Sequence, residues 1–248
     1  DIHFYHSKET HFFSFNHHKG AEWYQSLFDP QGESVVMEGS PEYAAWGRSE
    51  EIAGRIHELL PEAKLIYMVR DPLPRIASMY VQEVTNTGQA LPFSQALRAW
   101  PQLIDGSLYE RNYQIYADRF GADRIHVVFL DDYRANKDPA LREFCAFLDI
   151  APDPVLWEER AAKNTRDEKY FDHPLMRAAR KLPGFYQLKR LVSPERRAAL
   201  RQRFGRKVEI SANWTPEDRA LALEQIVPDA PAFLARYGKP GTLWTLEA

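Results

Sequence analysis

The chain has 248 residues, of which 44% are hydrophobic and 13% aromatic, and its net charge at pH 7 is −3. This length supports one large hydrophobic core or at most two modest ones, and no apolar run reaches the roughly 18 residues that a membrane span needs. Cys145 is the single cysteine, which excludes disulfides within the chain and any metal site built from a cysteine cluster.

Apolar runs and helical periodicities alternate along the chain and predict its elements. In chain order these are a helix at 20–28, a strand at 35–38, a helix at 49–60, a strand at 64–70, helices at 72–86, 93–100 and 107–120, a strand at 124–130, and helices at 139–148, 216–227 and 229–237. Strands that alternate with helices indicate a parallel sheet in an α/β domain. Beyond residue 150 we find no good strand, so that part is expected to be helical and loop-rich. Without repeats or a linker, a single domain is expected to cover residues 1–248.

Charge is distributed unevenly along the sequence. Residues 160–207 contain 15 Lys and Arg against four Asp and Glu, so this segment carries +11 and the remainder −14. Such a density predicts an anionic partner, such as a nucleotide, a phosphorylated or sulfated substrate or an anionic surface, whereas solvated helix faces explain most of the individual charges. No nucleic-acid-binding motif accompanies the charge, so nucleic acid is not the expected partner.

The most informative pattern lies in residues 64–80. Its apolar run ends in Arg70, an Asp71-Pro72 break follows, and the next helix carries Arg75 and Ser78. An arginine at the C-terminal end of a parallel strand lies where open α/β sheets bind ligands, and a guanidinium with a nearby hydroxyl suits a phosphate. The alternative is a structural Arg-Asp pair that closes the strand, and spacing alone does not separate the two.

A second group of candidate residues lies near the start of the chain. Lys8, Glu9 and His11 directly precede Phe12 and Phe13, which can bury the segment. In an extended run Glu9 and His11 point to the same face, with Lys8 on the other. A carboxylate beside an imidazole supplies a general base with an orienting partner, whereas the plainer interpretation is a solvated chain start.

Histidines are concentrated in the same region, which raises the question of a metal. Five of the eight histidines fall in the first 18 residues, but they have no cysteine partner and no His-x-x-x-His pair. We therefore predict no metal site.

Together these segments resemble the sulfotransferase family. Residues 65–80 are similar to the family's strand-and-helix element that binds the 3′-phosphate of 3′-phosphoadenosine 5′-phosphosulfate (PAPS). Residues 8–13 and 19–24 are similar to the region of the catalytic base in heparan-sulfate-type and bacterial carbohydrate sulfotransferases, and residues 237–244 to the ending of bacterial members. The resemblance implies a P-loop-NTPase-like domain with a central parallel sheet flanked by helices.

The resemblance also implies a reaction and its catalytic residues. Glu9 falls at the position of the catalytic base, His11 at that of an acceptor-site histidine, and Lys8 would help to neutralise the leaving phosphate. The implied reaction is the in-line transfer of a sulfuryl group to a hydroxyl or amine of a carbohydrate or other small acceptor, and it requires no metal.

The cofactor ligands follow from the same resemblance. Arg70 and Ser78 match the ligands of the 3′-phosphate of PAPS. Asn164 and Arg166, at the start of the basic region, are candidates for the loop that closes over the nucleotide. The family's Gly/Ser/Thr-rich sulfonate-binding loop does not occur in this sequence, so we expect it upstream of Asp1.

The sequence departs from the family pattern at one further place. Residues 38–43 are similar to a family segment that often has lysine where Gly39 stands, so a substrate-contacting cation is expected to be absent or to come from the basic region.

Two alternatives to a sulfotransferase stay open. One is a nucleotide-dependent kinase, which would need a Walker lysine-serine loop, and the other is a non-catalytic module that binds nucleotide or anionic glycan. The expected location is the bacterial cytoplasm. The sequence identifies neither the acceptor nor the oligomeric state.

Overall fold

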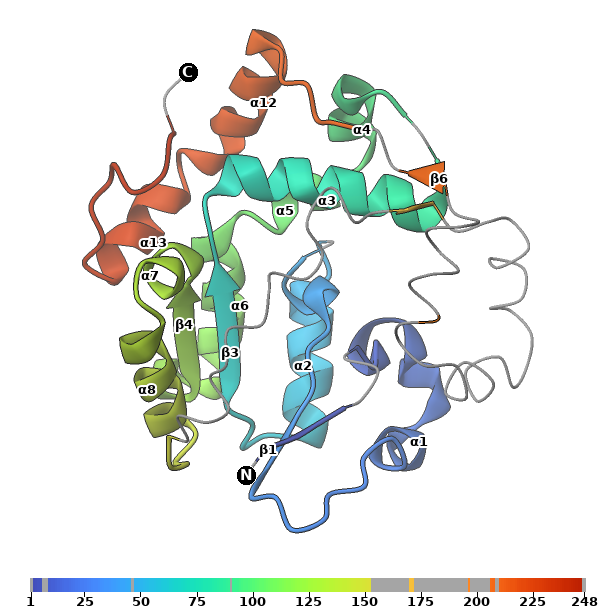
Figure 1. The fold of residues 1–248 in the computed structure, drawn as a ribbon, viewed down its shortest axis with the longest axis vertical. Coiled ribbons are helices and arrows are strands. Elements are labelled where there is room, and N and C mark those ends of the chain that lie inside the picture. The colour runs from blue at the N-terminus through green and yellow to red at the C-terminus, as the bar shows by residue number, and fades with distance from the viewer. Residues whose placement is uncertain are drawn as a thin grey trace.

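Helices surround short parallel strands in the structure, which is a computed structural model (Figure 1). It describes residues 2–5, 9–45, 47–89, 91–152, 170–171, 196, 206–207 and 210–246.

The strands described in the first 130 residues form two parallel pairs. β1 (Ile2–Phe4) pairs with β2 (Val35–Met37), and β3 (Leu65–Val69) pairs with β4 (Ile125–Phe129). Within each pair the chain returns through helical segments, because parallel strands cannot be joined by a tight turn. The parallel α/β arrangement expected from the sequence is therefore confirmed, although the described strands form two separate pairs rather than one continuous sheet.

The region beyond residue 150 contains strand structure that the sequence analysis did not expect. β5 (Tyr170–Phe171) pairs antiparallel with β6 (Arg206–Lys207). The expectation of no strand in this region was wrong because two residues are too short to produce an alternating hydrophobic pattern.

Every helix predicted from periodicity is present, with ends that differ by at most three residues. The described helices are α1 (Ala21–Gln25), α2 (Ser49–Leu59), α3 (Pro72–Thr87), α4 (Phe93–Ala99), α5 (Gln102–Asp105), α6 (Tyr109–Phe120), α7 (Leu130–Ala135), α8 (Lys137–Phe147), α12 (Pro216–Ile226) and α13 (Ala230–Arg236). The two that were not predicted, α5 and α7, have four and six residues. Among these helices, none combines the length and apolar character that crossing a bilayer takes.

The sequence around α3 explains why this helix begins and ends where it does. Asp71 is its N-cap and accepts a hydrogen bond from the N–H of Leu73 at 3.1 Å, while Pro72 provides a preorganised first residue. Gly88 ends the helix in the left-handed region, at φ 72°, and donates to the carbonyl of Val84. The helix therefore starts directly at the carboxyl end of β3.

An aromatic cluster fills the core beside the carboxyl ends of β3 and β4. It consists of Tyr109 on α6, Phe129 on β4, Phe233 on α13, and Trp244 near the end of the chain. All four are buried, and the indole N–H of Trp244 donates to Asp131 at 3.3 Å. The last described residues thus pack against the same strand ends that carry Arg70.

Candidate functional site

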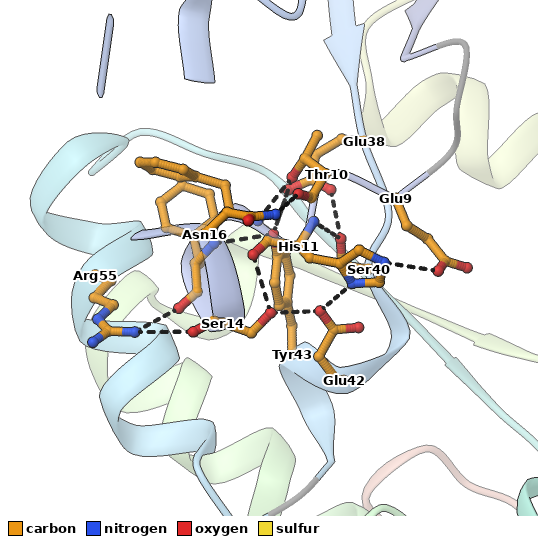
Figure 2. A network of polar contacts seen from close by, with 12 residues as sticks. Glu9, Thr10, His11, Ser14, Asn16, Glu38, Ser40, Glu42, Tyr43 and Arg55 are labelled. Atoms are coloured by element: carbon orange, nitrogen blue, oxygen red, sulfur yellow. Dashed lines mark hydrogen bonds and ion pairs between the residues drawn. The ribbon is translucent and has the colours of Figure 1, made fainter. Parts of the chain in front are cut away.

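The segment that carries Glu9 and His11 folds over the turn that follows β2 (Figure 2). It is not extended, as the sequence analysis assumed, because His11 has a left-handed backbone with φ 51° and a π-helical turn over Phe12–Asn16 follows. The N–H of His11 donates to the hydroxyl of Ser40 at 3.1 Å, which holds this unusual conformation. Phe12 and Phe13 are buried and anchor the segment in the core.

This turn brings His11 between two carboxylates. Its Nε2 lies 3.3 Å from Oε2 of Glu9, and its Nδ1 lies 2.7 Å from Oε1 of Glu42 (Figure 2). Hydrogen bonds to Glu42 and Glu9 outweigh partial burial and raise the pKa of His11 to about 10. The imidazole is therefore positively charged at neutral pH.

Glu42 lies in a 3₁₀ turn, Pro41–Ala44, and is buried. Burial acts to raise the pKa of Glu42, but hydrogen bonds from His11 and from the hydroxyl of Ser14 at 2.5 Å hold it below the ordinary value. Its charged form is thus stabilised inside the protein.

Glu38 is the third carboxylate of the network. Burial raises its pKa, although it accepts hydrogen bonds from Tyr43 at 2.8 Å and from Ser40 at 3.0 Å. The hydroxyl of Tyr116 on α6 donates to the carbonyl of Tyr43 at 2.5 Å, which ties the turn to the helical layer.

The sequence analysis missed Glu42 as a partner of His11. The two residues are 31 positions apart, and their contact arises from tertiary folding. The available signal was the Ser40-Pro41 break, which marks a turn after a strand but does not reveal what the turn will face.

Arg70 directly follows β3 and is half-buried. Its main chain is held at both polar groups by the hydroxyl of Tyr109, which accepts from the Arg70 N–H at 3.3 Å and donates to the Arg70 carbonyl at 2.7 Å. Among the residues that the structure describes, no hydrogen bond or ion pair engages the Arg70 guanidinium. Asp71 instead accepts main-chain N–H groups from Leu73 and Thr245. The structural Arg-Asp pair is therefore not what this strand end forms.

Two other guanidiniums and one carboxylate act on Arg70. Burial lowers the pKa of Arg70, and the guanidiniums of Arg75 and Arg134 also lower it, while Tyr109 and the Asp71 carboxylate act in the opposite direction. Arg75 on α3 is fixed by the carbonyl of Leu103 at 3.4 Å and by the hydroxyl of Ser107 at 3.2 Å. An anion at this place would relieve the repulsion between the guanidiniums.

Ser78 lies on α3, two turns after Arg70, and is half-buried. Within the described part of the chain its hydroxyl has no hydrogen-bond partner. Lys8, Asn164 and Arg166 lie outside the described residues. In the described ranges, no group of three or more His, Cys, Asp or Glu side chains could hold a metal ion.

Comparisons with known proteins identify relatives of this chain. Heparan sulfate glucosamine 3-O-sulfotransferase 6 of Homo sapiens is 32% identical over 142 residues, which cover 53% of this chain and 40% of that protein. The 3A1 enzyme of Mus musculus is 37% identical over 79 residues, which cover 32% of this chain and 19% of that protein. The aligned region thus spans less than half the length of these curated relatives.

A solved structure and a family model extend the comparison. The crystal structure of a sulfotransferase from Alicyclobacillus acidocaldarius aligns with 98% of this chain and 88% of that chain, with a TM-score of 0.63 at 20% identity. This likeness confirms the expected P-loop-like α/β fold. Residues 5–154 match the model of the sulfotransferase family, a range that includes Glu9, His11, Arg70 and Ser78. Since that match covers more than half of the chain, the chain belongs to the sulfotransferase family.

Proposed function

We propose that this protein transfers a sulfuryl group from PAPS to a hydroxyl or amine of a carbohydrate acceptor. Membership of the sulfotransferase family supports the reaction class. The similarity to heparan sulfate glucosamine 3-O-sulfotransferases supports a glycan acceptor, which can itself be anionic.

The observation that carries the donor assignment is the pair of unengaged polar groups after β3. A half-buried guanidinium and a half-buried hydroxyl, those of Arg70 and Ser78, have no partner among the described residues. Both groups are hydrogen-bond donors, and a terminal phosphate can accept from a guanidinium and from a hydroxyl. We assign them to the 3′-phosphate of PAPS, and the resemblance of the sequence adds Asn164 and Arg166 as further candidate ligands of the nucleotide.

Glu9 is the proposed proton acceptor of the reaction. Its side chain is 42% exposed, so an acceptor group arriving from solvent can reach it, unlike the buried Glu42. As the acceptor oxygen or nitrogen bonds to sulfur, its proton passes to Glu9, and the sulfur–oxygen bond to the 5′-phosphate breaks with its electron pair left on the phosphate. Lys8 would stabilise that leaving phosphate by its charge.

The test combines sulfotransfer with donor binding in the full-length polypeptide. Transfer of ³⁵S from labelled PAPS to heparan sulfate should fall by about 100-fold or more in Glu9→Gln, since a positioned base contributes roughly 10²–10⁴-fold. Affinity for 3′-phosphoadenosine 5′-phosphate (PAP), measured by calorimetry, should remain unchanged in that variant. Unaltered transfer would remove Glu9 as the base, and absence of PAP binding in the wild type would contradict the donor assignment.

A further inference from the structure

Glu42 is a buried carboxylate close to the proposed base, and the sequence analysis assigned it no role. The residue is 7% exposed, and its Oε1 accepts hydrogen bonds from both His11 and Ser14. A buried carboxylate is stable only when its charge is compensated, and the imidazole at 2.7 Å supplies the compensating charge. The contact is therefore more than a surface ion pair.

The two contacts of His11 determine its protonation state. Neutral imidazole has one N–H and one bare lone pair, so it can donate to a single carboxylate, and the lone pair would repel the other. Both ring nitrogens of His11 face carboxylate oxygens, at 2.7 Å and 3.3 Å. Only the imidazolium satisfies both, in agreement with the raised pKa of this group.

Two carboxylates, Glu9 and Glu42, face the ring of His11. Glu38, at the end of β2, is instead bound by the hydroxyl of Tyr43 and lies in the same network. Arg55 of α2 donates to main-chain carbonyls in the π-helical turn and pairs with a carboxylate of its own helix. The charge of His11 thus depends mainly on the two glutamates.

We infer that Glu42 is a positioning residue: it holds His11 as an imidazolium, and His11 in turn holds the Glu9 carboxylate in place. The inference rests on the proposed function in so far as Glu9 is the proton acceptor. An imidazolium has no lone pair with which to accept a proton, so His11 is not a second base. Glu42 fixes the ring from the buried side, and the exposed Glu9 is left as the group that meets the acceptor.

The direct test is the titration of His11 by NMR of ¹⁵N-histidine-labelled protein, with the signal assigned by its loss in His11→Gln. In the wild type, both ring nitrogens should remain protonated well above neutral pH. Glu42→Gln keeps an oxygen that can accept from His11 and Ser14 but removes the charge, so the midpoint should fall by at least about one pH unit, a tenfold loss of proton affinity. Glu42→Asp retains the charge and should preserve part of the shift.

Glu62→Gln is the matched control, because this exposed glutamate pairs with Arg124 and has no contact with His11. A titration of His11 in Glu42→Gln that equals the wild-type or control curve would overturn the inference. Because this readout needs no turnover, it is independent of the proposed function.

In the sulfotransfer assay, Glu42→Gln should lower kcat about tenfold or more with KM for PAPS unchanged. If the wild type is active and Glu42→Gln has the same kcat, the positioning role of Glu42 is overturned, while the proposed function stands.

Discussion

The hydroxyl of Tyr109 bridges both main-chain polar groups of Arg70, as an acceptor from its N–H at 3.3 Å and a donor to its carbonyl at 2.7 Å. Tyr109 is itself 1% exposed and packs in the aromatic cluster with Trp244 and Phe233. The strand end that presents the candidate phosphate ligand is thereby fixed by the core, while its guanidinium is left without a partner among the described residues. A rigid main chain with an unengaged side chain is the arrangement that a preformed binding site requires.

Replacement of Arg70 by alanine should weaken binding of PAP. A charge-assisted hydrogen bond to phosphate contributes about 1.5–3 kcal/mol, which corresponds to a roughly 10- to 150-fold higher Kd. Isothermal titration calorimetry measures the change. Arg124→Ala, which removes an arginine of a surface ion pair with Glu62, should bind PAP like the wild type. Equal affinities of Arg70→Ala and this control would exclude Arg70 from the site.

Removal of the Tyr109 hydroxyl should destabilise the fold. Tyr109→Phe removes two part-buried hydrogen bonds to the Arg70 N–H and carbonyl, and each such bond contributes about 0.5–1.5 kcal/mol. Urea denaturation should show the lower free energy of unfolding.

Tyr67→Phe provides the contrasting control. The Tyr67 hydroxyl is buried without a hydrogen-bond partner in the described structure, and its ring lies 6.0 Å from that of Tyr109. Its removal should leave the free energy of unfolding unchanged or raise it, because no hydrogen bond is lost. Equal destabilisation by the two substitutions would contradict the distinct roles of these hydroxyls.

Gly106 leaves room for the guanidinium of Arg75. A Cβ at position 106 would lie 2.0 Å from Nη2 of Arg75, whose guanidinium is held by Leu103 and Ser107. Gly106→Ala should therefore displace Arg75 and lower the free energy of unfolding by about 1–3 kcal/mol, measured in urea.

The matched glycine is Gly54, in the middle of α2, where an added Cβ meets nothing within 4 Å. Gly54→Ala should stabilise the protein by about 0.4–1 kcal/mol, because it reduces the freedom of the unfolded chain. Should Gly106→Ala prove as stable as the wild type, Arg75 would have to move without cost.

The sequence predicted those features that leave a periodic pattern. The ends of the strand before Arg70 and of the helix that carries Ser78 were predicted within a few residues. The strand is a continuous apolar run, the helix has a periodic apolar pattern, and Pro72 marks the break between them. β1 and α5 escaped prediction, since three or four residues show no period. The buried carboxylate Glu42 could not be found, because its meeting with His11 depends on a tertiary contact and on the left-handed turn at His11.

The pair of His11 and Glu42 should make stability depend on pH in a defined way. Folding raises the pKa of His11 to about 10, so its contribution is complete below the ordinary value of 6.5 and is lost as pH rises through about 10. Folding lowers the pKa of Glu42, so its contribution is present above the ordinary value of 4.5 and is lost as pH falls through the lowered value. The difference in unfolding free energy between the wild type and Glu42→Gln should thus be largest between about pH 5 and 6.5.

Urea denaturation of both proteins at a series of pH values measures this difference directly. It should shrink as pH rises from the folded-state pKa of His11 in Glu42→Gln towards that in the wild type, about 10, because over this interval only the folded wild type keeps the proton. Other groups titrate in the same range, but they are common to both proteins and cancel in the difference. For Glu62→Gln the difference from the wild type should not follow the titration of His11, because Glu62 pairs with Arg124 and has no contact with His11. A difference for Glu42→Gln that stays flat through about pH 10 as well would mean that the charge of Glu42 does not stabilise the protonated form of His11.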